Sequence, residues 1–117
     1  MSFRMLQADV LSWAKDKNLL HAENAPKQFM KFIEEVFEFK TEFDDKQRFA
    51  PDCVNINNLK LEMGDIFVTL IILCEQIGID PVECLSMAYE KISKRRGKTL
   101  NGNFYKQEDL EGMEWEK

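Results

Sequence analysis

The segment from residue 55 to residue 77 constrains the fold of this chain more than any other. Plotted on a helical wheel at about 100° per residue, it is apolar around most of its circumference. Its polar residues form one narrow stripe: Asn55, Asn58, Glu62, Asp65, Thr69 and Gln76. A helix of this kind has to be surrounded by other helices. The segment therefore predicts a helical core and, because one short chain covers it poorly, an interface between copies of the chain.

Three further segments have helical spacing. Residues 2–17 begin at Ser2, an N-cap candidate. The caps Asn24 and Asp80 precede residues 25–44 and 81–96, each of which has a proline in its first turn. We expect a loop over residues 45–54. Four helices in 117 residues predict a single all-α domain, a four-helix bundle with its core over residues 2–98. Residues 99–117 are expected to form a short irregular tail with a turn at Asn101-Gly102 and, at most, a strand over residues 103–106.

Composition limits the partners of the chain. Its formal charge of −5 argues against binding to a nucleic-acid backbone, which needs a basic face. The N-terminus lacks the apolar stretch of a secretory signal, and residues 66–74 are too few to span a bilayer. Cys53, Cys74 and Cys84 form no pairing motif, and Cys74 is expected to be a core residue. We therefore expect a cytoplasmic protein that binds neither membrane nor nucleic acid and that forms a homodimer or homotetramer.

Two acidic pairs carry the functional signal. Glu35 and Glu38 lie three residues apart on the second helix, and Glu62 and Asp65 lie three residues apart on the third, so each pair shares a helix face. Charge runs of this kind usually lie on a solvated face. However, Glu38, Glu62 and Asp65 have no lysine or arginine three or four residues away. Only Glu35 and its neighbour Glu34 have such a partner, which is Lys31. Facing carboxylates need a cation between them, either a metal ion or a basic side chain from elsewhere in the chain.

The type of metal follows from the available ligands. Di-iron bundles use Glu-x-x-His pairs, and the single histidine, His21, is in no such pair. Zinc favours cysteine and histidine, and the cysteines are scattered. Carboxylates alone favour Mg²⁺ or Mn²⁺, and Mg²⁺ is usually held by a few carboxylates together with the phosphates of a substrate. The predicted substrate is therefore a polyphosphate.

The basic residues that would hold such phosphates lie near the end of the fourth helix. Lys91, Lys94 and Arg95 belong to the strongest basic cluster of an acidic chain, although cations at this position also interact favourably with the helix dipole. Gln28 and Lys31, on the acidic face of the second helix, are placed to reach the same ligand. Trp13 is expected mainly in the core, with stacking on a base as the alternative, and His21 is expected to be a loop or capping residue.

In the order and spacing of these motifs the chain resembles the MazG-like nucleoside triphosphate pyrophosphohydrolases, the all-α NTP pyrophosphatase superfamily. The resemblance extends over residues 13–98 and rests on residues 28–38, on residues 61–67, and on Lys91 with Arg95. It implies a MazG-type bundle. It also implies a set of site residues: Glu35, Glu38, Glu62 and Asp65 as Mg²⁺ ligands, Lys91, Lys94 and Arg95 on the triphosphate, and Glu34 supporting the ligands or acting as the base. The pocket for the nucleobase of the substrate cannot be matched to the family.

The function expected from this pattern is Mg²⁺-dependent cleavage of a nucleoside triphosphate to a monophosphate and pyrophosphate, with Glu34, Glu35 and Glu38 as the catalytic residues. Its physiological role would be the removal of noncanonical nucleotides. Three alternatives stay open: a noncatalytic adaptor that binds metal or nucleotide, a phosphoribosyl-ATP pyrophosphohydrolase-like enzyme, and a purely structural bundle. Turnover of a nucleotide panel with Mg²⁺ distinguishes the enzymes from the adaptor, and the purely structural bundle predicts no effect of Mg²⁺ on the melting temperature.

Overall fold

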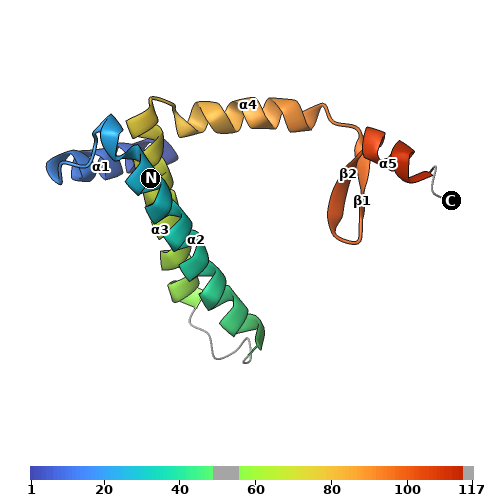
Figure 1. Ribbon diagram of the computed structural model, residues 1–117, viewed down its shortest axis with the longest axis horizontal. Helices are drawn as coiled ribbons and strands as arrows, with labels where there is room; N and C mark the ends of the chain where they lie inside the picture. Colours follow the sequence, from blue (N-terminus) through green and yellow to red (C-terminus); the bar gives the residue numbers. More distant parts are fainter. Residues whose placement is uncertain (49–55, 115–117) are drawn as a thin grey trace. The chain divides into compact units, whose positions relative to one another are not determined.

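The computed structural model describes residues 1–48 and 56–114 of the chain. Most of this part is helical, which confirms the predicted all-α character (Figure 1). The chain divides into two compact units, Met1–Pro81 and Val82–Lys117. No helix within the described ranges combines the length and apolar content needed to cross a membrane.

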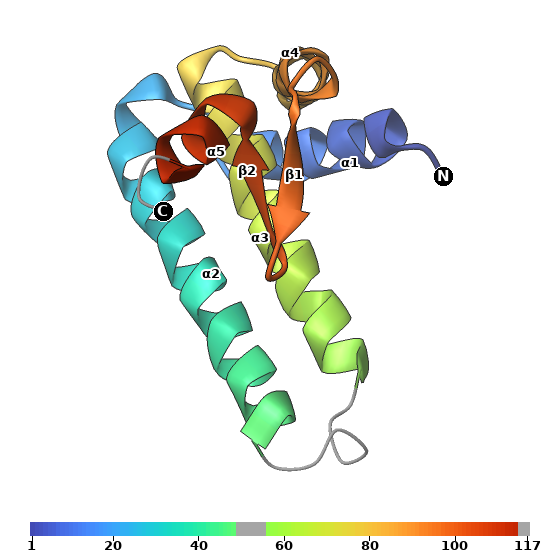
Figure 2. The ribbon, with the colours of Figure 1, turned by 90° about the vertical axis from the view of Figure 1, so that its right-hand side faces the viewer.

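The first unit is built on two long helices. Helix α2 (Ala25–Arg48) and helix α3 (Ile56–Ile77) run side by side in opposite directions, as Figures 1 and 2 show. Helix α1 (Phe3–Asp16) contacts α3, and a short 3-10 helix η1 (Ala22–Asn24) leads into α2. Helix α2 is one turn longer than predicted, since residues 45–48 continue it. The rest of the predicted loop, including Cys53, and Asn55 of the polar stripe lie outside the described residues.

The helix ends of the first unit follow the predicted caps. The hydroxyl of Ser2 accepts a hydrogen bond of 3.1 Å from the backbone N–H of Met5, as an N-cap does. At the other end of the unit, α3 stops at Gly78, whose φ of +79° suits a residue without a side chain. The backbone N–H of Ile79 then reaches back to the carbonyl of Cys74 at 2.9 Å, which closes the helix.

Polar contacts tie the end of α3 to the segments around it. The guanidinium of Arg4 donates two hydrogen bonds, of 2.8 and 2.6 Å, to the carboxylate of Asp80. The side-chain amide of Gln76 donates a bond of 2.8 Å to the backbone carbonyl of Leu19, in the connection between α1 and η1. Both contacts hold the start of the chain against the end of α3.

The core of the first unit is small. Its buried apolar residues are Ala14 from α1 and four from α3: Leu59, Ile71, Ile72 and Cys74. The expectation that Cys74 is a core residue is thus confirmed. The other elements nevertheless do not cover all the apolar side chains of α3, because Leu61 is 68% exposed and Phe67 is 49% exposed.

The second unit differs from the prediction. Helix α4 (Pro81–Ser93) starts as expected but ends one turn early, because the N–H groups of Lys94 and Arg95 turn back to carbonyls three residues earlier. The predicted irregular tail was wrong, but the turn at Asn101-Gly102 and the strand over residues 103–106 are confirmed. Strands β1 (Gly97–Leu100) and β2 (Asn103–Lys106) form an antiparallel hairpin, and helix α5 (Gln107–Glu114) follows it (Figure 2).

The turn of this hairpin explains the correction. Asn101 and Gly102 have φ values of +53° and +81°, and a two-residue hairpin turn of this kind needs positive φ at both positions. The four residue pairs run from Gly97 opposite Lys106 to Leu100 opposite Asn103. Leu110 of α5, only 6% exposed, gives the second unit a buried apolar centre that an irregular tail would lack.

Candidate functional site

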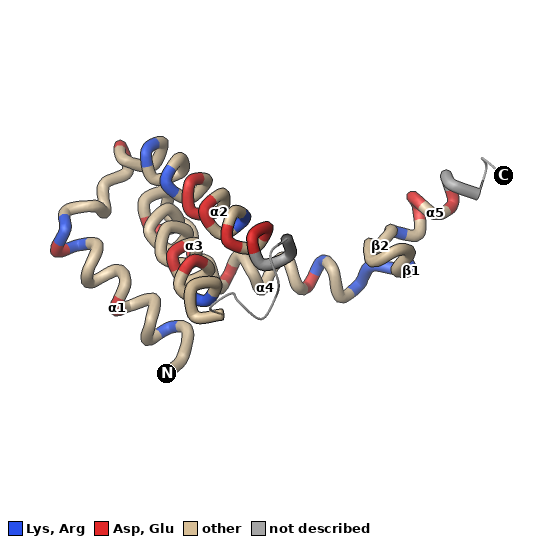
Figure 3. Tube along the Cα trace, turned by 90° about the horizontal axis from the view of Figure 1, so that it is seen from below, with Lys and Arg blue, Asp and Glu red and all other residues tan. Residues whose placement is uncertain are grey.

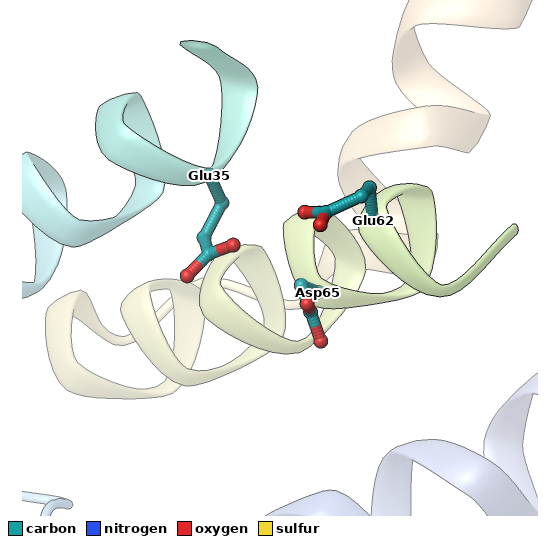
Figure 4. A group of neighbouring side chains, drawn as sticks. All are labelled: Glu35, Glu62 and Asp65. Carbon is teal, nitrogen blue, oxygen red and sulfur yellow. The ribbon is translucent and has the colours of Figure 1, made fainter. Parts of the chain in front are cut away.

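Three of the four predicted acidic ligands converge between α2 and α3. Glu35, Glu62 and Asp65 each offer a carboxylate oxygen, and these oxygens all lie within 4.8 Å of one another. Figure 3 shows the acidic positions gathered on α2 and on the first half of α3. In Figure 4, Glu35 projects from α2 toward α3, on which Glu62 and Asp65 lie one turn apart. Among the residues that the structure describes, this is the one group of three potential metal ligands.

The carboxylates of this cluster lack full compensation. Glu35 is only 8% exposed, and Lys31 Nζ lies 3.6 Å from its Oε1. Within residues 1–48 and 56–114, neither Oε2 of Glu35 nor Oε2 of Glu62 has a hydrogen-bond partner, although both atoms are buried. A buried carboxylate oxygen without a partner is costly, so the site as it stands is short of positive charge or of hydrogen-bond donors.

The electrostatics of the cluster agree with this deficit. Burial raises the pKa of Glu35 above its ordinary value of 4.5, and the neighbouring Glu38 and Asp65 raise it further while Lys31 opposes them. Burial also raises the pKa of Glu62, followed by the charges of Glu38, Asp65 and Glu42. Both shifts mean that the protein environment disfavours the ionised form. A divalent cation would reverse that preference.

The donor set fits a hard cation. The cluster contains carboxylates and no cysteine or histidine among the described residues, which is the chemistry of Mg²⁺ or Mn²⁺ rather than of zinc. The two unpartnered oxygens are free to coordinate. Lys31 is 57% exposed, and within the cluster its ion pair is with Oε1 of Glu35 and not with either unpartnered oxygen, so it does not replace an ion there.

A pocket of about 610 Å³ opens beside the cluster, lined by residues of α1, α2 and α3 and of the connection before η1. Glu35 and Asp65 form its acidic end. Its α3 wall continues with Val68, Thr69 and Ile72, which repeat on one helix face. Trp13 of α1 covers a further side. The pocket is large enough for a small organic ligand next to a metal ion.

The structure brings both predicted ligand-binding residues of α2 into this pocket. Gln28 donates a hydrogen bond of 3.3 Å to the backbone carbonyl of Thr69, and Lys31 lines the wall one turn further along α2. The carboxylate of Glu34 lies 3.7 Å from Lys31 Nζ and is 61% exposed. Glu38 is exposed and outside the group of three, but its charge acts on both Glu35 and Glu62.

The predicted phosphate-binding residues lie in the second unit. Lys91 is in the last turn of α4, and Lys94 lies 3.6 Å from Glu90 of the same helix. Lys94 and Arg95 also line a groove of about 340 Å³ that Lys106 and the first residues of α5 complete. These residues therefore form a basic surface of the second unit, separate in the chain from the acidic cluster.

Other residues were only partly anticipated. Trp13 is 51% exposed and lines the pocket, so it is not a core residue as was mainly expected. His21 contacts Asn18 at 2.6 Å and acts within the loop, as expected. Gln76 lines the pocket and had no predicted role. Its membership of the same polar stripe as Asp65 and Thr69 was the signal that could have found it.

Comparison with known proteins adds no assignment to this geometry. No protein-family model matches the chain, and neither does any curated protein or solved structure.

Proposed function

We propose that this protein is a Mg²⁺-dependent nucleoside triphosphate pyrophosphohydrolase, with Mn²⁺ as a possible substitute for Mg²⁺. The observation that carries the proposal is the convergence of Glu35, Glu62 and Asp65, because two of these residues, Glu35 and Asp65, line one end of a pocket that Lys31 and Gln28 also line. Such a site combines carboxylates for a metal with room for a ligand that brings its own phosphates. The resemblance to the MazG-like enzymes supports the same function.

The metal ligands would be Glu35, Glu62 and Asp65. Glu38, on the exposed side of α2, would be a fourth carboxylate ligand. When bound, Mg²⁺ supplies neutralisation of phosphate charge and a water molecule of lowered pKa for attack on phosphorus. Lys31 is close enough to Glu35 to hold a phosphate oxygen beside the carboxylates. Gln28 is fixed to α3 through Thr69 and offers its amide oxygen to the ligand.

Glu34 is the proposed base. It lies on the same turn of α2 as Glu35, is well exposed to water, and has Lys31 at 3.7 Å to hold its carboxylate in place. It would orient or deprotonate the attacking water, and the bond between the α and β phosphates would break. Lys91, Lys94 and Arg95 are proposed to bind the triphosphate, as the family resemblance implies.

We propose that the working protein is a homodimer or homotetramer of MazG-type bundles. Helix α4, all of which the structure describes, buries none of its side chains, and Leu85, Met87 and Tyr89 are each at least 65% exposed. Soluble monomers rarely expose apolar side chains in such density. A second copy of the chain would cover them.

The test is a substrate panel. Purified protein is incubated with Mg²⁺ and each common deoxynucleoside triphosphate, with dUTP, with deaminated and methylated nucleotides, and with phosphoribosyl-ATP. Monophosphate and pyrophosphate in equal amounts are the expected products, and chelation of Mg²⁺ should stop their formation. Nucleotide binding without products would instead support a noncatalytic adaptor, and turnover of phosphoribosyl-ATP alone would favour that related hydrolase.

A matched pair of variants links turnover to the cluster. Glu62→Gln removes one half-buried carboxylate of the site, whereas Glu75→Gln makes the same change at an exposed position on the same helix. Pyrophosphate release should be lost in the first and kept in the second. Equal activity of both variants would contradict the proposed site.

A further inference from the structure

The pocket has a second polar end that the metal chemistry does not use. Gln76 is 7% exposed and lines the pocket. Its Oε1 is buried and has no hydrogen-bond partner in the described part of the chain. It is thus an acceptor without a donor, and a buried acceptor that stays unpaired costs about 1 to 3 kcal/mol of stability.

The orientation of this amide is fixed by its other atom. Nε2 of Gln76 donates to the backbone carbonyl of Leu19 at 2.8 Å. A carbonyl can only accept, so turning the amide over would bring two oxygens together and lose the bond. Oε1 therefore stays an acceptor, and a ligand group in contact with it has to be a donor.

Gln76 also lies far from the acidic cluster. Eleven residues separate it from Asp65 on α3, which is about 16 Å along the helix axis. Thr69 and Ile72 lie between them on the same face and line the same pocket. A nucleotide with its phosphates at Glu35 and Asp65 would point its base toward Gln76, past the side chain of Trp13.

We propose that Gln76 is a specificity-determining residue that selects bases with an amino group at the edge farthest from the sugar. This inference rests on the proposed function for the placement of the phosphates. Cytosine carries an amino group at C4 and adenine carries one at C6, whereas uracil, thymine and hypoxanthine carry a carbonyl oxygen there. The amino group donates the hydrogen bond that Oε1 lacks. The carbonyl oxygen would face another acceptor and leave both unpaired.

The experiment compares nucleotides that differ at that one group. Pyrophosphate release is measured for dCTP against dUTP and for dATP against dITP, at the same Mg²⁺ concentration. The value of kcat/KM should be at least about tenfold higher for the amino member of each pair, which corresponds to one net hydrogen bond. Equal values within both pairs would overturn the role of Gln76 and leave the proposed function intact.

Variants assign the preference to the residue. Gln76→Met keeps the length of the side chain without its acceptor, and Glu75→Met places the same residue at the exposed neighbouring position. The ratio within each pair should fall toward one in the first and stay unchanged in the second. Gln76→Asn, which keeps an amide but draws it back by one methylene, should give an intermediate ratio and serves if the methionine variant does not fold. An unchanged ratio in the folded Gln76 variant would contradict the assignment.

The two hypotheses fail in different ways. If no nucleotide of the panel is hydrolysed, the proposed function is wrong. The same pairs are then compared by calorimetric titration of the magnesium nucleotide into the protein. Tighter binding of the amino members would still support an acceptor at Gln76, and equal or undetectable binding would overturn it.

Discussion

Lys31 Nζ lies 3.6 Å from Oε1 of Glu35, one turn further along α2, while Oε2 of the same carboxylate has no hydrogen-bond partner among the described residues. The lysine therefore compensates half of the buried group. It also places a positive charge next to the proposed metal position.

This relationship predicts opposite effects of Lys31→Met on two ligands. Affinity for Mg²⁺ alone should rise by about twofold to fivefold, because an exposed cation beside the site no longer repels the ion. Affinity for a magnesium nucleotide should fall, because a phosphate contact is lost. Calorimetric titration measures both. A parallel loss of both affinities would show that Lys31 supports the fold of the site rather than the ligand.

Replacing one carboxylate of the cluster should separate stability from metal binding. In Mg²⁺-free buffer, Glu62→Gln should unfold at the same or a higher temperature than the unmodified protein, because burial and like charges disfavour the ionised group. Saturating Mg²⁺ should stabilise the unmodified protein, by about 2.7 kcal/mol at a hundred times Kd, and should not stabilise the variant. Thermal melts with and without Mg²⁺ measure this. The exposed Glu75→Gln should retain the full magnesium effect.

The stability of the metal-free protein should depend on pH in a defined direction. The pKa values of Glu35 and Glu62 are raised in the folded state, so their stabilising contribution is complete below the ordinary value of 4.5 and is lost as the pH rises through the raised values. The free energy of unfolding, measured against the double variant Glu35→Gln/Glu62→Gln, should therefore fall as the pH rises above the ordinary pKa of 4.5. Stabilisation by Mg²⁺ should grow over the same range. A difference that is flat in pH would contradict the electrostatic description of the cluster.

Glu38 tests how far the metal site extends. Glu38→Ala should lower pyrophosphate release by about 100-fold or more, with a change in the free energy of unfolding within about 0.5 kcal/mol because the side chain is exposed. Steady-state kinetics and denaturant titration measure the two quantities. Retained turnover would remove Glu38 from the ligands and leave Glu35, Glu62 and Asp65 as the complete set.

The exposed apolar side chains of α4 predict an oligomer. Light scattering after size-exclusion chromatography should give a mass of two or four times 13.8 kDa. Leu85→Glu, at a position 70% exposed, should shift the protein toward the monomer mass, since a charge at an apolar interface is unfavourable. A mass of 13.8 kDa for the unmodified protein would contradict the oligomer.

The sequence predicted the helices well where local chemistry decides their ends. Ser2, Pro26 and Pro81 mark the starts of α1, α2 and α4 because caps and first-turn prolines act within one turn. The turn at Asn101-Gly102 and a strand over residues 103–106 could be predicted, whereas the partner strand over residues 97–100 and helix α5 could not. The strands of the hairpin are only four residues long, and polar and apolar residues do not alternate regularly in them. The hairpin is therefore defined by the pairing of its strands and by the burial of Leu110, which the local sequence does not reveal.

The candidate site, too, could be predicted from the sequence only in part. Helical periodicity placed Glu62 and Asp65 on one face of α3, and the lack of local cations pointed to a partner across the bundle. Which residues of α2 and α1 would face them depends on how the helices pack, and single-helix periodicity does not contain that information. Gln76 illustrates this, because only its bond to Leu19 and its unpartnered oxygen give it a role.

A crystal structure grown with Mn²⁺ and a non-hydrolysable nucleoside triphosphate tests the central claim most directly. The account predicts anomalous density for manganese at about 2.0 to 2.2 Å from carboxylate oxygens of Glu35, Glu62 and Asp65, with phosphate oxygens completing its coordination. Density for the nucleotide elsewhere, or those carboxylates paired with lysine and arginine and without an ion, would contradict it.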